Sequence, residues 1–118
     1  MDKSWVFPYS KIKKGAKVVL YGAGKIGEAF ASQNEATGYC NIVAHVDSNY
    51  RDIHNEKIED PQIIENIEYD YILIAVNSRE FTKQIVEDLK ARRIDCKKII
   101  TINNVDVDNA FFELTEKN

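Results

Sequence analysis

The sequence has 118 residues, of which 44% are hydrophobic and 30% are charged, and its formal net charge is −3. The length supports a single domain over residues 1–118, and the acidic balance argues against a nucleic-acid binder, which would carry an excess of Lys and Arg. No apolar run approaches the roughly 20 residues that span a bilayer, and no signal peptide is visible, so we expect a cytoplasmic protein without a membrane span.

Residues 1–16 form a lead-in to a predicted core at 17–102. Aromatic residues of this lead-in, among them Trp5 and Phe7, are expected to pack on the same domain. Two other placements stay open, because these rings could dock on a neighbouring subunit or belong to a longer linker.

A strand, a glycine-rich turn and a helix follow the lead-in. Lys17–Tyr21 is nearly all apolar, which is typical of a parallel strand buried on both faces. Apolar residues at helical spacing predict an amphipathic helix over about 25–35. The turn between them carries three glycines at G-x-G-x-x-G spacing, namely Gly22, Gly24 and Gly27.

Each glycine has a mechanical role in a turn that carries a nucleotide pyrophosphate. Gly22 permits the tight turn, Gly24 lets the backbone approach the phosphate oxygens, and Gly27 lets the helix pack close to the strand. The first N–H groups of the helix lack internal partners and lie at the positive end of its dipole, so they favour an anion. We therefore interpret the turn as a phosphate-binding loop. The alternative is a structural glycine turn with an empty phosphate site.

A second predicted strand, Asn41–Val46, ends at Asp47, about 20 residues after Gly27, the spacing at which a carboxylate reaches the ribose hydroxyls of a dinucleotide. A carboxylate there repels a 2′-phosphate, so NAD(H) is preferred over NADP(H). Arg51 is close enough in sequence to keep that preference modest.

The remaining segments continue the alternation of strands and helices. We predict a short strand at 57–58, a helix at 61–67 capped by Asp60, a strand at 69–76, a helix at 79–92, a strand at 97–102 and a tail helix within 105–118. This alternation indicates an α/β fold, a doubly wound parallel sheet of about five strands in the order 3-2-1-4-5, which is Rossmann-like.

Ligands of such sheets bind at the carboxyl ends of the strands, where the strand order reverses. The candidate ligand-binding residues on that edge are Gly22, Ala23, Gly24, Lys25, Ile26, Gly27, Asp47, Ser48, Asn77 and Ser78. Lys25 would add positive charge beside a phosphate or remain solvated. Ser78 is interpreted first as the N-cap of the next helix.

The sequence offers no catalytic base or nucleophile beside this crevice. His45 lies inside a strand, where a satisfied or partly exposed histidine is expected, and His54 lies in a polar loop. Cys40 and Cys96 are too few and too far apart for a metal site or a disulfide, so two reduced thiols are expected.

At this point the sequence resembles a known group of modules. The residues that carry the likeness are Val18–Gly27, a strand ending in Val46-Asp47, and Tyr69–Val76. The pattern is similar to the N-terminal nucleotide-binding domain of bacterial nucleoside-diphosphate-sugar epimerases and dehydratases that make surface polysaccharides. CoA-binding domains have a related pattern. Asp47 is followed by Ser48-Asn49 and not by the group's second acid and glycine turn, and the catalytic domain of those enzymes is absent.

Four functions remain open. The first is a nucleotide-binding domain for NAD(H) or a nucleotide-sugar, serving as a binding or regulatory part of sugar-nucleotide or cell-surface polysaccharide synthesis without complete catalytic machinery. The second is a subunit of an NAD-dependent epimerase, dehydratase or dehydrogenase whose active site is completed by another chain. The third is a module for S-adenosylmethionine or CoA. The fourth is a structural module, in which aromatic residues near both termini mediate assembly as a homo-oligomer.

Overall fold

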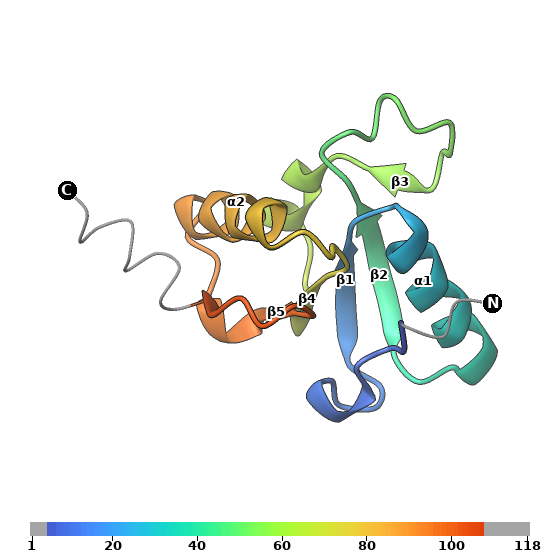
Figure 1. Ribbon diagram of the computed structural model, residues 1–118. Helices are drawn as coiled ribbons and strands as arrows, with labels where there is room; N and C mark the ends of the chain where they lie inside the picture. The colour runs from blue at the N-terminus through green and yellow to red at the C-terminus, as the bar shows by residue number, and fades with distance from the viewer. Residues whose placement is uncertain (1–4, 108–118) are drawn as a thin grey trace.

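A computed structural model describes residues 5–107 and shows one parallel sheet with helices on both faces (Figure 1). Its strands are β1 (Lys17–Tyr21), β2 (Asn41–Val46), β3 (Ile58–Glu59), β4 (Tyr71–Ile74) and β5 (Ile99–Thr101). Every pairing is parallel, in the order β3-β2-β1-β4-β5. The predicted fold class and strand order are therefore confirmed.

Two α-helices and three short 3₁₀ helices connect these strands within the described residues. They are α1 (Lys25–Thr37), α2 (Arg79–Ala91), η1 (Tyr9–Lys11), η2 (Pro61–Asn66) and η3 (Cys96–Lys98). Neither α-helix is long and apolar enough to cross a membrane. The tail helix predicted within 105–118, with Phe111 and Phe112, lies almost entirely outside the described residues.

Several elements differ from the predictions, and the short strand predicted at 57–58 is shifted by one residue, to Ile58–Glu59. The strand predicted at 69–76 is shorter, because β1 pairs with β4 only from Tyr71 to Ile74. The strand predicted at 97–102 begins at Ile99, since the Asp95 side chain accepts a hydrogen bond from the Lys97 N–H and starts η3 instead. The segment predicted as a helix at 61–67 is the 3₁₀ helix η2, which Asp60 caps as expected.

The alternation of β1 side chains divides the core into two layers. Val19 and Tyr21 pack with side chains of η2 and α2, such as Ile64, Val86 and Leu89. Val18 and Leu20 face the other way, into a cluster with α1 and the lead-in. All four β1 side chains are at most 4% exposed, which explains why this strand is apolar on both faces.

The lead-in forms part of the second layer. Phe7 is 1% exposed and packs edge-to-face on Phe30, with ring centroids 5.7 Å apart. The Tyr39 hydroxyl donates to the carbonyl oxygens of Tyr9 (3.0 Å) and Ile12 (2.6 Å). The expectation that the lead-in aromatics pack on their own domain is confirmed for these residues.

Both cysteines are free thiols, as expected. Cys40 is buried at the start of β2, and burial raises the pKa of its thiol. Cys96 lies in η3, directly before β5, and β1 and β4 separate β5 from β2 in the sheet.

Tyr21 makes the fold sensitive to alkali. Burial, together with the carboxylates of Asp88 and Asp47, raises the pKa of Tyr21 from 10.0 to about 12. The unfolded chain therefore loses this proton first, so the stabilisation that Tyr21 contributes is complete below pH 10 and disappears as the pH rises toward 12. In urea titrations between pH 9 and 12, we expect Tyr21→Phe to lose less stability than the wild type. An equal loss in both proteins would contradict this role.

Candidate functional site

A cleft of about 600 Å³ opens at the carboxyl edge of the sheet, a volume suited to a small-molecule ligand. It lies where β1, β2 and β4 end, on the side that α1 covers. The residues that line it are Trp5, Gly22, Ala23, Gly24, Lys25, Ile26, Ala29, Gln33, Asp47, Ala75, Val76 and Asn77. Three chain segments predicted to converge, the glycine turn, Asp47 and Asn77, thus meet at one cleft.

Two glycines are required by the fold itself. Gly22 has a φ of +118°, and a Cβ there would lie 2.9 Å from the Ala75 carbonyl oxygen. A Cβ on Gly27 would lie 2.0 Å from the Gly22 carbonyl oxygen, a distance that no packing tolerates. Gly27 therefore packs directly against the glycine turn. Its role is to let α1 approach the end of β1, and it does not line the cleft.

Gly24 is different, because no heavy atom lies within 4 Å of the Cβ that a substitution would add there. Its backbone is extended, with φ −81° and ψ −162°, which other residues also adopt. The fold gives no reason for glycine at this position. An empty space above the first turn of a helix is what an approaching ligand would need.

The N-terminus of α1 lacks the side-chain cap that the other long helix has. At α2 the Ser78 hydroxyl accepts a hydrogen bond from the Phe81 N–H at 3.2 Å, whereas Gly24 offers α1 no such acceptor. The first-turn N–H groups of α1 begin at Lys25, beside the cleft. Uncapped N–H groups at the positive end of a helix dipole form an anion-binding position.

Asp47 holds the glycine turn in place. One of its carboxylate oxygens accepts a hydrogen bond from the Ala23 N–H and the other accepts from the Asn49 N–H, each at 2.8 Å. The Ala23 N–H is therefore engaged by a carboxylate, so the N–H groups available to a phosphate start at Gly24. Each carboxylate oxygen keeps a second lone pair, and a ribose hydroxyl could donate to it.

His45, expected only as a satisfied strand residue, also fixes this turn. Its Nε2 lies 2.7 Å from the Gly22 carbonyl oxygen, so the ring donates an N–H to it. The role depends on an irregularity in β2, where Val18 is paired with Ile42 but Val19 with Ala44. Simple alternation along the strand does not reveal such an irregularity.

The loop after β4, which lines one side of the cleft, is hydrogen-bonded to a residue that follows β5. The Asn103 side-chain amide donates to the carbonyl oxygens of Val76 (3.2 Å) and Asn77 (2.9 Å). The sequence analysis ends a predicted strand at residue 102 and gives Asn103, the next residue, no role in the site. Its role depends on two loops that are distant in sequence, and nothing in the local pattern signals it.

The remaining predicted residues lie beside the cleft or behind it. Ser48 lines an adjoining hollow of about 380 Å³, together with Asn49 and the exposed ring of Phe81. The capping interpretation of Ser78 is confirmed, and a ligand contact from it stays a prediction. Lys25 and Asp47 are the titratable side chains among the described residues that line the 600 Å³ cleft. Within the described residues, no His, Cys, Asp and Glu side chains gather in a way that could hold a metal ion.

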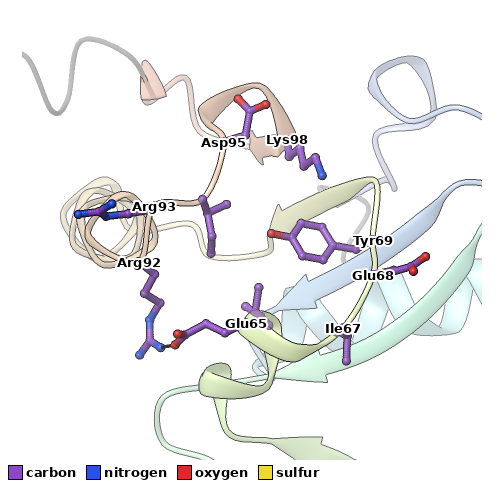
Figure 2. Close-up of a pocket in the computed structure, with 10 residues that line it drawn as sticks. Glu65, Ile67, Glu68, Tyr69, Arg92, Arg93, Asp95 and Lys98 are labelled. Carbon is purple, nitrogen blue, oxygen red and sulfur yellow. Dashed lines mark hydrogen bonds and ion pairs between the residues drawn. The ribbon is translucent and has the colours of Figure 1, made fainter.

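A larger hollow of about 720 Å³ lies at the opposite, amino edge of the sheet, and an ion pair between two of its lining residues, Arg92 and Glu65, spans part of it (Figure 2). Figure 2 shows Arg92 reaching to Glu65, and its guanidinium also binds Asp88 at 2.9 Å. The Lys98 ammonium lies 5.0 Å from the centre of the Tyr69 ring. Since ligands of parallel sheets bind at the carboxyl edge, we assign the candidate site to the smaller cleft.

The strand order and the cleft at the carboxyl edge of the sheet define a Rossmann-like architecture. A family profile described as C2185-like, N-terminal matches residues 14–100, and the chain belongs to this family. A comparison with curated proteins finds no match.

Solved structures with the same fold support this assignment. The chain is similar to UDP-D-quinovosamine 4-dehydrogenase from Vibrio fischeri, with 24% identity over 82% of this chain and 86% of that chain and a TM-score of 0.59. It is also similar to RSP, a Rex-family repressor, with 16% identity over 88% of this chain and a TM-score of 0.56. The match spans 59% of the RSP chain. RSP has also been solved with β-NADH, and with β-NAD⁺ and operator DNA. At these identities the likeness establishes the fold.

The two histidines provide a matched test of how the glycine turn is held. His45→Phe removes the donor to the Gly22 carbonyl and should lower the free energy of unfolding by about 1–3 kcal/mol, because a part-buried acceptor loses its partner. His54→Phe, at an exposed position of the β2–β3 segment, should change it by less than about 0.5 kcal/mol. Urea denaturation measures both variants, and equal effects would contradict the role of His45.

Proposed function

We propose that this chain is an NAD(H)-binding module. The observation that carries the proposal is the uncapped first turn of α1, which meets open space at Gly24 and faces the same cleft as the Asp47 carboxylate. A pyrophosphate suits the N–H groups that begin at Gly24, and a ribose diol suits the spare lone pairs of Asp47. The complexes of RSP with β-NADH and β-NAD⁺ support the same ligand class.

The charge at the end of β2 favours NAD(H) over NADP(H). The Asp47 carboxylate lies where the ribose of the adenosine half is expected, and a 2′-phosphate there would face a negative charge. Arg51 lies in the following turn, where its Nε donates to the Tyr50 hydroxyl at 3.0 Å. NADP(H) is therefore the weaker ligand in this proposal.

We further propose that the module serves as a binding or regulatory part of sugar-nucleotide or surface-polysaccharide synthesis. The similarity to a dehydrogenase named for a UDP-sugar supports this setting, as does the sequence resemblance to sugar-nucleotide epimerases and dehydratases. Lys25 and Asp47 are the titratable groups of the cleft, so catalysis would need groups from another chain. A net charge of −3 argues against nucleic acid as a partner.

Gly24→Val tests the phosphate position without altering the fold. The extended backbone at Gly24 accepts valine, and its side chain would occupy the space above α1. In a thermal-shift panel of NAD⁺, NADH, NADPH, S-adenosylmethionine, CoA and UDP-sugars, the wild type should gain about 2.7 kcal/mol from NADH at 100 times its dissociation constant. The variant should melt at the wild-type temperature without ligand and gain nothing from NADH. Retained binding in the folded variant would exclude the phosphate role.

Asp47→Asn tests the ribose position through a ratio of affinities. The substitution also disturbs the hydrogen bonds to Ala23 and Asn49, and this disturbance affects every ligand equally. An effect that is equal for every ligand drops out of the ratio of NADH affinity to NADPH affinity. We expect this ratio to fall about tenfold, since the variant no longer repels the 2′-phosphate. Calorimetric titration with both cofactors gives the ratio, and an unchanged ratio would overturn the ribose assignment.

A further inference from the structure

We infer that Trp5 is a specificity-determining residue, the wall of the cleft on which the nicotinamide ring of the dinucleotide stacks. This inference rests on the proposed function and extends it to the second half of the ligand. Trp5 lines the same cleft as the glycine turn and Asp47, although it precedes β1 and lies outside every motif. The sequence analysis favours packing on the same domain for Trp5, leaves docking on a neighbouring subunit or membership of a linker open, and predicts no ligand contact for it.

The cleft has a polar part and an apolar part. The polar part comprises Asp47 and the N–H groups from Gly24 onward, which are assigned above to the adenosine ribose and the pyrophosphate. The apolar part consists of Trp5, Ile26 and Ala29 on the α1 side and of Ala75 and Val76 at the end of β4. A dinucleotide has one further planar ring beyond the pyrophosphate, and a half-buried indole offers that ring a flat apolar surface.

Trp5 is held at the cleft by a side chain that also lines it. The Gln33 carboxamide donates through Nε2 to the Trp5 carbonyl oxygen and accepts through Oε1 from the Phe7 N–H, both at 2.8 Å. Phe7 itself is buried in the α1 layer, so the segment is fixed at two consecutive contacts. These hydrogen bonds hold the backbone at Trp5, and its half-buried side chain packs against the core cluster beneath α1. The segment is therefore placed at the cleft before any ligand arrives, which reduces the entropic cost of stacking.

The positive charge of the oxidised nicotinamide ring should strengthen its attraction to the Trp5 indole. The oxidised nicotinamide is a pyridinium cation, and the face of an indole attracts cations more strongly than other aromatic faces do. The oxidised dinucleotide should therefore gain the most from Trp5. ADP-ribose has the same adenosine, pyrophosphate and second ribose but no nicotinamide, so it is the matched ligand for the test.

Calorimetric titration of NAD⁺ and ADP-ribose into wild type, Trp5→Phe and Trp5→Ala tests the inference. Trp5→Ala should weaken NAD⁺ binding on the order of tenfold and leave ADP-ribose binding within about twofold, whereas Trp5→Phe should keep most of the affinity. Equal losses for both ligands, or no loss for NAD⁺, would overturn the stacking role while leaving the proposed function intact. Failure of the wild type to bind either ligand would overturn the proposed function and this inference with it.

Quenching of tryptophan fluorescence distinguishes a residue that contacts the ligand from one that serves the fold alone. Trp5 is the single tryptophan of the sequence, so its emission reports on the cleft without interference from other indoles. NAD⁺ should quench this emission and ADP-ribose should not. Gln33→Leu releases the Trp5 carbonyl and should reduce the quenching at saturating NAD⁺, whereas Gln62→Leu, exposed on η2, should not. Quenching of equal depth in the Gln33 variant would contradict the positioning role.

Discussion

The contact between Gly27 and the carbonyl oxygen of Gly22 is the constraint on which the rest of the site depends. Because no Cβ fits between them, α1 begins directly against the end of β1, and its first N–H groups lie at the edge of the sheet. His45 from β2 donates to the same carbonyl oxygen, and Asp47 accepts a hydrogen bond from the other side of that peptide group, the Ala23 N–H. Packing and hydrogen bonding thus fix the turn from two sides.

The cleft is built by side chains whose partners are backbone atoms. Asp47 and His45 fix the glycine turn, Asn103 fixes the end of β4, and Gln33 fixes the lead-in. Such contacts hold a binding surface in shape without supplying a reactive group. Among the described residues that line the cleft, the titratable side chains are Lys25 and Asp47.

The fold could be predicted from the sequence because its signals are local. The apolar run of β1, the glycine spacing and the acid after β2 each appear within a few residues, and their order determines the topology. The ends of β4 and β5 could not be predicted, because the partner strand limits the paired length. The role of His45 depends on an irregular register in β2, and those of Trp5 and Gln33 on a contact between segments about 30 residues apart. For His45, the sign available in the sequence was a histidine within the largely apolar segment 42–46.

In the proposed function, Asp47 both contacts the ligand and holds the glycine turn, whereas Gly24 serves the ligand alone, so the two positions differ in what they reveal when relatives are compared. A descendant that lost its ligand would still need the carboxylate to hold the turn, so selection for stability alone would preserve the acid. Nothing in the fold would preserve glycine at position 24, since the space above it is empty. Under the proposed function, drift at position 24 with retention of the acid would therefore mark family members that do not bind a nucleotide.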